Sequence, residues 1–366
     1  MIAIDGVNAF LQNGLAEIPS TSRHGFVAKD KGRQIRLPRH DGHFKEGQTI
    51  LARVLLISST FPPVTGGSAV VYENLCRCAQ GAIAGLGARH DYMTGQTLAG
   101  ADAHDAQVNY PMHRMDLLRP AQISSASGLR GKLQDLGLMA KLLARTVCIA
   151  RREGARVICL GDLVYGGWLV FPLRYLFGYK VLLYVHGEEV TTRSGGGLFD
   201  NGRAKFLDHA HGVVAVSGFT RDALIRLMGT DAAKIALIPN GVDTAKFQPR
   251  PPRADIAERY GVTGRRVILS VGRLVARKGQ DHLVKAMPAI LAACPDAHLL
   301  IAGEGPLRAT LESLIVLHGL QARVTLLGEV SDAALADLYA QADIFALPNR
   351  EMPDGDTEGF GLVFLE

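Results

Sequence analysis

Cysteine is scarce in this sequence, and its positions indicate neither a disulfide framework nor a metal site. Only five cysteines occur among 366 residues, and none has a partner at Cys-x-x-Cys spacing. They are Cys76, Cys78, Cys148, Cys159 and Cys294. An odd number without paired spacing argues against disulfide staples, so we expect a reducing compartment, the cytoplasm.

Several motifs that define other enzyme classes are also missing. The chain contains no His-Glu-x-x-His, no Gly-x-Gly-x-x-Gly and no basic tract with interleaved aromatic residues. The first and last absences argue against a metalloprotease and against a nucleic-acid-binding protein. We find no Asp-x-Asp metal motif beside the predicted strand ends, and we expect no essential metal ion and no other cofactor.

No uninterrupted apolar run has the length of a membrane-spanning helix. The stretch 166–185 is apolar, but Pro172, Arg174, Gly178 and Lys180 interrupt it. We expect a buried helix followed by a buried strand there. The first residues lack a basic start followed by an apolar block, so we expect no signal peptide.

The composition that is present is that of a globular protein of more than one domain. Hydrophobic residues make up 48% and charged residues 20%, and the formal net charge is +5. The length favours two domains. The small basic excess favours contact with phosphates or with an anionic membrane surface.

Short apolar runs recur along the chain with the length of buried β-strands. They are 53–59, 157–161, 181–185, 213–217, 235–239, 267–272, 298–303, 324–328 and 344–348. We expect a helix from about Ala69 to Leu86 and further helices between most of these runs. Alternating strands and helices predict parallel sheets that are covered by helices on both faces.

Turn residues and prolines at 238–253 divide this pattern into two parts. We predict an N-terminal extension at 1–50, partly disordered, a Rossmann-like domain at 51–245 and a second at 246–366. The fold class is α/β, with two doubly wound domains. Ligands of such sheets bind at the carboxyl ends of the strands.

Two candidate site features follow predicted strands of the first domain. Gly66 and Gly67 lie between a strand and a helix, where backbone amides can approach an anion. An ordinary tight turn is the alternative. His186 follows another strand, and it is either a catalytic residue or a structural hydrogen-bonding one.

The second domain has two similar loops. Arg273 and Lys278 are separated by five positions between a strand and a helix, which suits a diphosphate. A solvated basic loop is the alternative. Gly303 follows the next strand and either admits a ligand or forms a turn before Pro306.

The last nine residues, EGFGLVFLE, place a carboxylate on each side of a glycine-containing turn. Gly359 and Gly361 can expose backbone amides to a phosphate at a helix start. Glu366 could then accept hydrogen bonds from sugar hydroxyls, and Glu358 could face a sugar carbon that develops positive charge. Two solvated charges are the alternative.

Together these motifs resemble the retaining glycosyltransferases of family 4, which have the GT-B fold. The matching stretches are GGSA (66–69), HGEEV (186–190), VSGFTRD (216–222), IPNGVD (238–243), VGRLVARKGQD (271–281), GEGPLR (303–308) and the E-x7-E motif EGFGLVFLE. The likeness covers about residues 51–366. It is most similar to bacterial enzymes that mannosylate phosphatidylinositol lipids or build exopolysaccharides.

The resemblance implies a role for each candidate residue. The catalytic set would be His186 at the reacting sugar, Arg273 and Lys278 at the diphosphate, and Glu358 at the donor sugar. The donor-binding set would be Gly66, Gly67, Gly303, Gly328, Val330, Phe360, Gly361, Leu362 and Glu366.

The resemblance also implies an activity. We expect transfer of a hexose from a nucleotide diphosphate sugar, GDP-mannose or a UDP-hexose, to a lipid-linked or oligosaccharide acceptor, through two domains that face a cleft. One alternative is a GT-B-fold epimerase, which would need no acceptor. The other is an inactive nucleotide-binding remnant, because the family continues beyond the E-x7-E motif and the second domain would here be incomplete.

One further expectation concerns the membrane. The stretch 128–152 mixes apolar and basic residues at near-helical spacing. A helix that packs on the core with a solvated face is the favoured interpretation. Peripheral association with the inner membrane face is the second.

Overall fold

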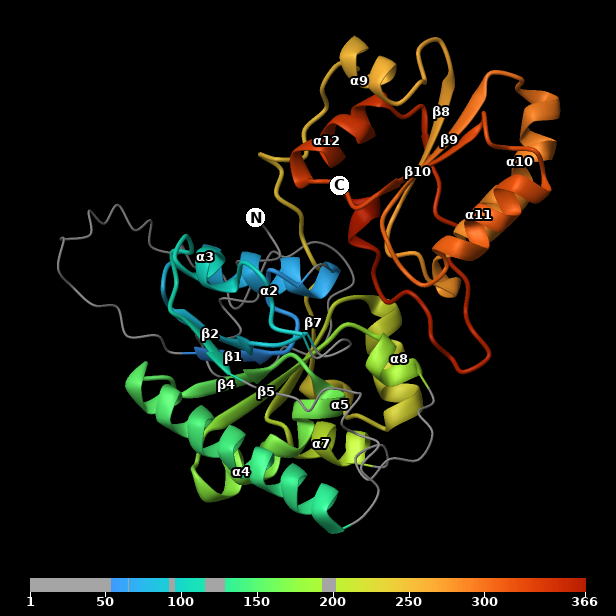
Figure 1. Ribbon diagram of the computed structural model, residues 1–366. Coiled ribbons are helices and arrows are strands. Elements are labelled where there is room, and N and C mark those ends of the chain that lie inside the picture. The colour runs from blue at the N-terminus through green and yellow to red at the C-terminus, as the bar shows by residue number, and fades with distance from the viewer. Residues whose placement is uncertain (1–53, 65, 92–95, 116–128, 193–201) are drawn as a thin grey trace, which may run out of the picture.

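The computed structural model describes residues 54–64, 66–91, 96–115, 129–192 and 202–366. Within them lie two parallel sheets, and each sheet with its helices forms a separate α/β domain (Figure 1). The first has the order β3-β2-β1-β4-β5-β6-β7 and the second β10-β9-β8-β11. Both orders follow the doubly wound pattern in which the strand order reverses after the first strand. The predicted extension at 1–50 lies outside the described residues.

The strands of the first sheet are β1 (Val54–Ser58), β2 (Ile83–Ala88), β3 (Met112–Met115), β4 (Val157–Leu160), β5 (Lys180–Val185), β6 (Gly212–Ala215) and β7 (Ile235–Leu237). Its helices are α2 (Gly67–Cys78), α3 (Ala101–Asp105), α4 (Leu129–Arg152), α5 (Leu163–Gly166), α6 (Glu188–Thr191), α7 (Arg203–His209) and α8 (Gly218–Met228). Shorter 3₁₀ or π segments are Gly167–Leu169, Pro172–Leu176 and Ala232–Lys234.

The second sheet consists of β8 (Arg266–Val271), β9 (Ala297–Ala302), β10 (Val324–Gly328) and β11 (Ile344–Phe345). Its helices are α9 (Ala254–Arg259), α10 (Gln280–Ala293), α11 (Arg308–Leu317) and α12 (Asp332–Gln341). Short 3₁₀ turns cover Ala276–Lys278 and Leu362–Phe364.

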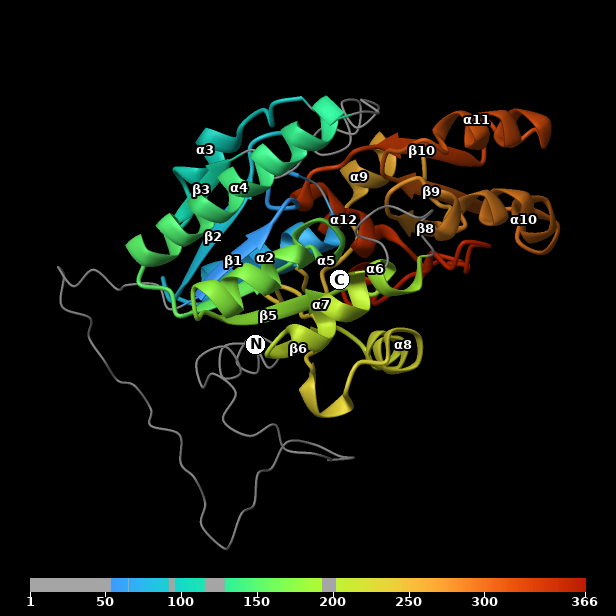
Figure 2. The ribbon, with the colours of Figure 1, turned by 90° about the horizontal axis from the view of Figure 1, so that it is seen from below.

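Strand β1 shows why continuous apolar runs form these sheets. Alternate side chains of a strand point to opposite faces. Leu55 and Ile57 pack with α4, α7 and α8, whereas Val54 and Leu56 pack with α2. Figures 1 and 2 show α4 and α2 on opposite faces of the sheet. Because helices cover both faces, every position of β1 is buried and must be apolar or hydrogen-bonded.

The predicted helix from Ala69 to Leu86 is wrong in its second half, since α2 ends at Cys78 and β2 begins at Ile83. Gln80 and Gly81 adopt positive φ angles of 50° and 83°, which no helix continues. Within β2, a Cβ on Gly85 would lie 2.6 Å from the Met112 sulfur. The glycines of β2 therefore serve close packing against β3, which periodicity alone did not reveal.

The predicted strand at 344–348 is shorter than expected. Only Ile344 and Phe345 pair with β8. After them the chain turns, with the Asn349 amide donating to the Leu347 carbonyl. The Pro348 carbonyl is so close to Gly279 that a Cβ on that glycine would overlap it. Contact with the start of α10 thus ends β11 early.

The chain returns from the second sheet to the first domain (Figure 1). Leu362 is buried among Tyr72, Tyr184 and other core residues of the first domain, and Phe360 packs beside it. The boundary predicted between 245 and 246 lies between the two sheets, but these later residues contribute to the core of the first domain.

The apolar stretch 166–185 folds as a short helical region followed by β5. In the described part of the chain, no helix has both the length and the apolar character needed to cross a membrane.

Candidate active site

Two loops with candidate residues, the one after β1 with Gly66 and the one after β8 with Lys278, lie where the strand order of their sheet reverses. In the first sheet this point is between β1 and β4, where the Asp162 carboxylate accepts a 2.6 Å hydrogen bond from the Ser59 amide. In the second it is between β8 and β11, and Arg273 follows β8 directly. Doubly wound folds bind ligands at these positions.

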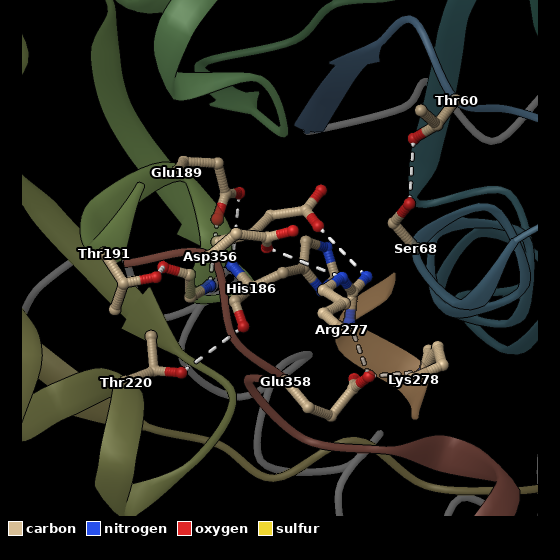
Figure 3. Close-up of polar contacts among 12 residues, drawn as sticks. Thr60, Ser68, His186, Glu189, Thr191, Thr220, Arg277, Lys278, Asp356 and Glu358 are labelled. Carbon is tan, nitrogen blue, oxygen red and sulfur yellow. Dashed lines mark hydrogen bonds and ion pairs between the residues drawn. The ribbon is translucent and has the colours of Figure 1, made fainter. Parts of the chain in front are cut away.

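A cluster of two cations and one carboxylate forms on the second domain. The Glu358 carboxylate accepts a 2.7 Å hydrogen bond from Arg277 and another from Lys278 (Figure 3). Burial by itself would raise the pKa of Glu358, but Lys278 and Arg277 outweigh it and hold that pKa below its usual value. Glu358 is therefore ionised at neutral pH.

Lys278 experiences the opposite balance. Burial lowers its pKa, and the Glu358 carboxylate offsets this only in part because Arg277 and Arg273 repel the ammonium. Two largely buried cationic side chains, Arg277 and Lys278, thus share the Glu358 carboxylate. An anionic ligand such as a diphosphate can replace or join that carboxylate as a partner of Lys278.

Arg273 does not join this cluster. Its side chain is exposed and forms no hydrogen bond or ion pair with another described residue. The sequence predicted that Arg273 and Lys278 converge on one ligand, whereas the structure places Arg277 beside Lys278 at Glu358. The diphosphate role of Arg273 stays a prediction.

Arg277 also reaches two further carboxylates, Asp356 at 3.5 Å and Glu188 of the first domain at 3.3 Å. Asp354 and Asp356 have the Asp-x-Asp spacing, which the sequence interpretation overlooked because they lie well beyond β11. Among the described residues, no group of three or more metal-ligating side chains could hold a metal ion.

His186 lies at the end of β5, as predicted. Its Nε2 is 2.8 Å from the Tyr72 hydroxyl, which itself donates to the Gly161 carbonyl. His186 therefore donates from Nε2, and Nδ1 is left as an acceptor. Burial lowers the pKa of His186 to about 4, so the ring is neutral at neutral pH. A neutral ring can accept or share a proton, but it supplies no positive charge.

Glu189 fixes the turn after His186. Its two carboxylate oxygens accept hydrogen bonds from the amides of His186, at 3.2 Å, and Gly187, at 2.9 Å. Gly187 has φ +120°, a conformation that side chains rarely adopt. Burial, followed by repulsion from Glu188, raises the pKa of Glu189 to about 7.

The glycines of the first-domain loop remain accessible. Gly66 precedes α2 with φ +151° and Gly67 is its first residue, and both are exposed. A Cβ on Gly66 would meet no atom within 4 Å, and one on Gly67 would lie 3.5 Å from Leu362. The loop thus faces Leu362 in the returning segment of the second domain.

The glycines of the second-domain loops are in closer contact with neighbouring atoms. The Gly303 amide donates to the Gly328 carbonyl at 2.7 Å, and a Cβ on Gly303 would overlap the Gly272 carbonyl. Gly303 therefore serves contact between neighbouring strand ends. Gly328 adopts φ +73° beside Glu304, and Val330 is half-buried against the second-domain core.

The segment EGFGLVFLE contacts the first domain. A Cβ on Gly359 would overlap the His186 carbonyl, and the Gly359 carbonyl accepts a 2.7 Å hydrogen bond from Ser217. No described residue accepts a hydrogen bond from the amides of Phe360 or Gly361. Glu366 lies two residues beyond the 3₁₀ turn Leu362–Phe364 and accepts a 3.0 Å hydrogen bond from Tyr339.

Sequence reasoning missed Arg277, Glu188, Glu189, Tyr72 and Ser217 as neighbours of the site. Arg277 directly precedes Lys278 and could have been suspected from that position. Glu189 likewise lies within three positions of its partners His186 and Gly187. Glu188, Tyr72 and Ser217 are separated from their partners by long stretches of chain, such as the 142 positions between Ser217 and Gly359. Only the fold brings them together.

Comparison with known proteins agrees with this arrangement. The model of Glycosyltransferase Family 4 matches residues 65–246, and that of Glycosyl transferases group 1 matches residues 253–366. A GDP-mannose-dependent alpha-(1-6)-phosphatidylinositol monomannoside mannosyltransferase of Mycobacterium tuberculosis H37Rv is 32% identical over 324 residues, 86% of this chain and 78% of the relative.

A Corynebacterium glutamicum enzyme that acts on monoacylated phosphatidylinositol monomannoside is 42% identical over 35% of this chain and 34% of its own. HepE of Anabaena, solved with UDP and glucose, superposes with a TM-score of 0.64 at 22% identity, covering 85% and 76% of the two chains. A sucrose-phosphate synthase of Thermosynechococcus elongatus superposes with a TM-score of 0.63 at 22% identity, covering 85% of this chain and 77% of its own.

The two domains therefore have the GT-B fold, and the site belongs to a nucleotide-sugar-dependent glycosyltransferase. The chain belongs to glycosyltransferase family 4, as the sequence motifs indicated.

Proposed function

We propose that this enzyme transfers a mannosyl group from GDP-mannose to a mannosylated phosphatidylinositol-type glycolipid, with retention of the anomeric configuration. The relationship to the mycobacterial mannosyltransferase, which extends across both domains, supports the donor and the acceptor class. The observation that carries the proposal is the Lys278–Arg277–Glu358 cluster of the second domain, held next to the His186 strand end of the first.

In this proposal the second domain binds the donor. Lys278 and the exposed Arg273 bind the diphosphate and stabilise the charge that grows as it leaves. The amides of Phe360 and Gly361, together with those near Gly66 and Gly67, contact phosphate and sugar. Glu366 accepts from the ribose hydroxyls, and Gly328 and Val330 border the base.

The first domain presents the acceptor. His186, neutral and hydrogen-bonded through Tyr72, lies at the end of β5 and would contact the reacting sugar or the acceptor hydroxyl. The attacking hydroxyl would approach the same face that the diphosphate leaves. Because cationic side chains neutralise the diphosphate, the transfer requires no metal ion in this scheme, and activity should survive chelation by EDTA.

The direct test is incubation of the chain with radiolabelled GDP-mannose and vesicles that contain phosphatidylinositol mannoside. We expect labelled lipid whose new linkage is α by nuclear magnetic resonance, and little product with UDP-glucose. Conversion of GDP-mannose to an isomer without acceptor would instead identify an epimerase. Absence of both nucleotide binding and transfer would identify an inactive remnant.

We further propose peripheral contact with the cytoplasmic membrane face through the basic side of α4. The apolar side, including Leu142, Val147 and Ile149, is buried in the first-domain core, as the favoured interpretation had it. Lys141 and Arg145 are exposed on the other side. Contact would therefore be electrostatic, and vesicle flotation should depend on anionic lipid and decrease with salt. Binding to neutral vesicles alone would contradict this.

A further inference from the structure

Arg277 makes one of the polar contacts between the two domains. Its guanidinium lies 2.7 Å from Glu358 and 3.5 Å from Asp356, both in its own domain, and 3.3 Å from Glu188 in α6 of the first domain. The Arg277 side chain is only 11% exposed. A planar guanidinium can donate to several carboxylates at once, which a lysine ammonium in the same place would do poorly.

A second contact lies next to Glu358. Gly359 approaches the His186 carbonyl so closely that no side chain would fit between them. Ser217, just before α8, donates to the Gly359 carbonyl. The φ angle of Gly359 is not in the left-handed region, so the requirement for glycine arises from this approach alone. Glu358 is thus tied to the first domain by its neighbour in the chain as well as by Arg277.

We propose that Arg277 is a positioning residue that links Glu358 to Glu188 and thereby holds the donor-side carboxylate in a fixed place relative to the acceptor-side domain. The inference deepens the proposed function and depends on it, because it assigns donor and acceptor to different domains. Reacting atoms must approach to about 3–3.5 Å in a productive complex. Donor and acceptor are carried by separate domains, so a cross-domain contact at the donor carboxylate limits their relative displacement.

Lys278 cannot replace Arg277 in this role. Its ammonium contacts Glu358 alone among the carboxylates of the described residues. The Glu188 side chain is 53% exposed, so removing its charge should leave the fold intact and weaken only the cross-domain contact. Glu188 is therefore the more informative position to change.

The test uses Glu188→Gln in the full chain, with Asp222→Asn as the matched control. Asp222 is 61% exposed and pairs with Arg221 at 2.8 Å within the first domain. We expect Glu188→Gln to lower kcat about two- to fivefold, the effect of one exposed ion pair, while the Kd for GDP measured by calorimetry changes less than about twofold. Asp222→Asn should change neither.

Arg277→Lys tests the bridge itself. The lysine retains a positive charge for Glu358 but lacks the planar guanidinium that can donate to several carboxylates at once. We therefore expect kcat to fall about tenfold or more. If Arg277 acts through Glu188, the double variant should be no slower than Arg277→Lys alone. Independent, multiplying effects would overturn the proposal, as would a Glu188→Gln enzyme with the kcat of Asp222→Asn.

Amide hydrogen exchange supplies a readout that does not require transfer. Glu188→Gln should increase exchange in both 186–191 and 355–362, and Asp222→Asn in neither. If Glu188→Gln increases exchange but the wild-type chain transfers no mannose, the Arg277–Glu188 contact between the domains is supported and the proposed function is rejected. If the wild-type chain transfers mannose but Glu188→Gln leaves exchange unchanged, the proposed function is supported and the positioning role of the Arg277–Glu188 contact is rejected.

Discussion

The two domains share one strand pattern but differ in how the polar groups at their strand ends are stabilised. At the end of β5 in the first domain, burial disfavours charge, because it lowers the pKa of His186 to about 4 and raises that of Glu189 to about 7. In the second domain, opposite charges face one another, as at Lys278 and Glu358. Burial of hydrogen-bonding groups therefore dominates on one side and ion pairing on the other.

This difference corresponds to the two substrates that we propose. Ion pairs can exchange one partner for a phosphate, which suits a domain that binds and releases a charged donor. Neutral donors and acceptors suit hydroxyl groups, whose hydrogen bonds need no counter-charge. Each of the following predictions tests one side of the comparison.

The largest effect is expected on the ionic side. Lys278→Ala should lower kcat about ten- to a hundredfold, because a charge-assisted interaction with the leaving diphosphate is lost. Arg273→Ala should lower turnover similarly but leave the melting temperature unchanged, since Arg273 forms no ion pair with the described residues. Lys285→Ala, which removes a half-exposed ammonium that pairs with the buried Asp281, is the control. Near-normal kcat in both site variants would contradict the donor assignment.

On the neutral side, the first test is His186→Gln, followed by stability measurements between pH 7 and pH 4. The unfolded chain protonates this residue near pH 6.5, and the folded state resists protonation down to about pH 4. His186 therefore makes wild-type stability fall as the pH falls through this window, by up to about 3 kcal/mol. The variant should lose that decline in denaturant unfolding, and identical pH profiles would show that His186 is not buried.

Glu189→Gln should have a similar or slightly smaller effect of opposite sign. The folded state retains the proton up to about pH 7, whereas the unfolded chain loses it near pH 4.5. Wild-type stability should consequently fall as the pH rises from 4.5 to 7, by about 2–3 kcal/mol from this group. The two slopes oppose each other between pH 4.5 and 6.5, so each single variant should reveal the slope that the other residue contributes. A double variant should remove both.

The smallest effect is expected for Tyr339→Phe on the ionic side. Tyr339 donates to Glu366 at 3.0 Å and thereby holds the last 3₁₀ turn. Its loss should cost about 1 kcal/mol of stability. Affinity for GDP should stay within about twofold if the ribose replaces Tyr339 as a partner of Glu366. Tyr260→Phe, whose hydroxyl forms no hydrogen bond with the described residues, is the control, and a tenfold loss of GDP affinity would contradict this exchange.

Sequence patterns predicted the class of fold because burial on both faces imposes apolar residues at every position of a strand. They failed at β2, whose alternating small residues Ala84, Gly85 and Gly87 resemble no apolar run. Gly85 and Gly87 are small because the Met112 and Phe61 side chains occupy the space that a Cβ would need. The predicted helix therefore ran on through β2, because the small residues of this strand are explained only by the side chains that pack against it.

The candidate residues were predictable where one motif contains the whole feature. His186, for example, directly follows its strand, as the motif predicted. Arg277 was missed because its partners Glu358 and Glu188 lie 81 and 89 positions away, on both sides of the domain boundary. No local spacing encodes such a contact.

By itself, the sequence determined the alternation of strands and helices, the glycine turns and the charged motifs, because each depends on neighbours within a few residues. The tertiary structure decided which charge faces which carboxylate and which groups lose their charge. Those outcomes depend on burial and on distances between segments that only the packed domains establish. The sequence motifs therefore supply the chemical groups of the site, while the packing of the two domains determines the charges and pKa values of those groups.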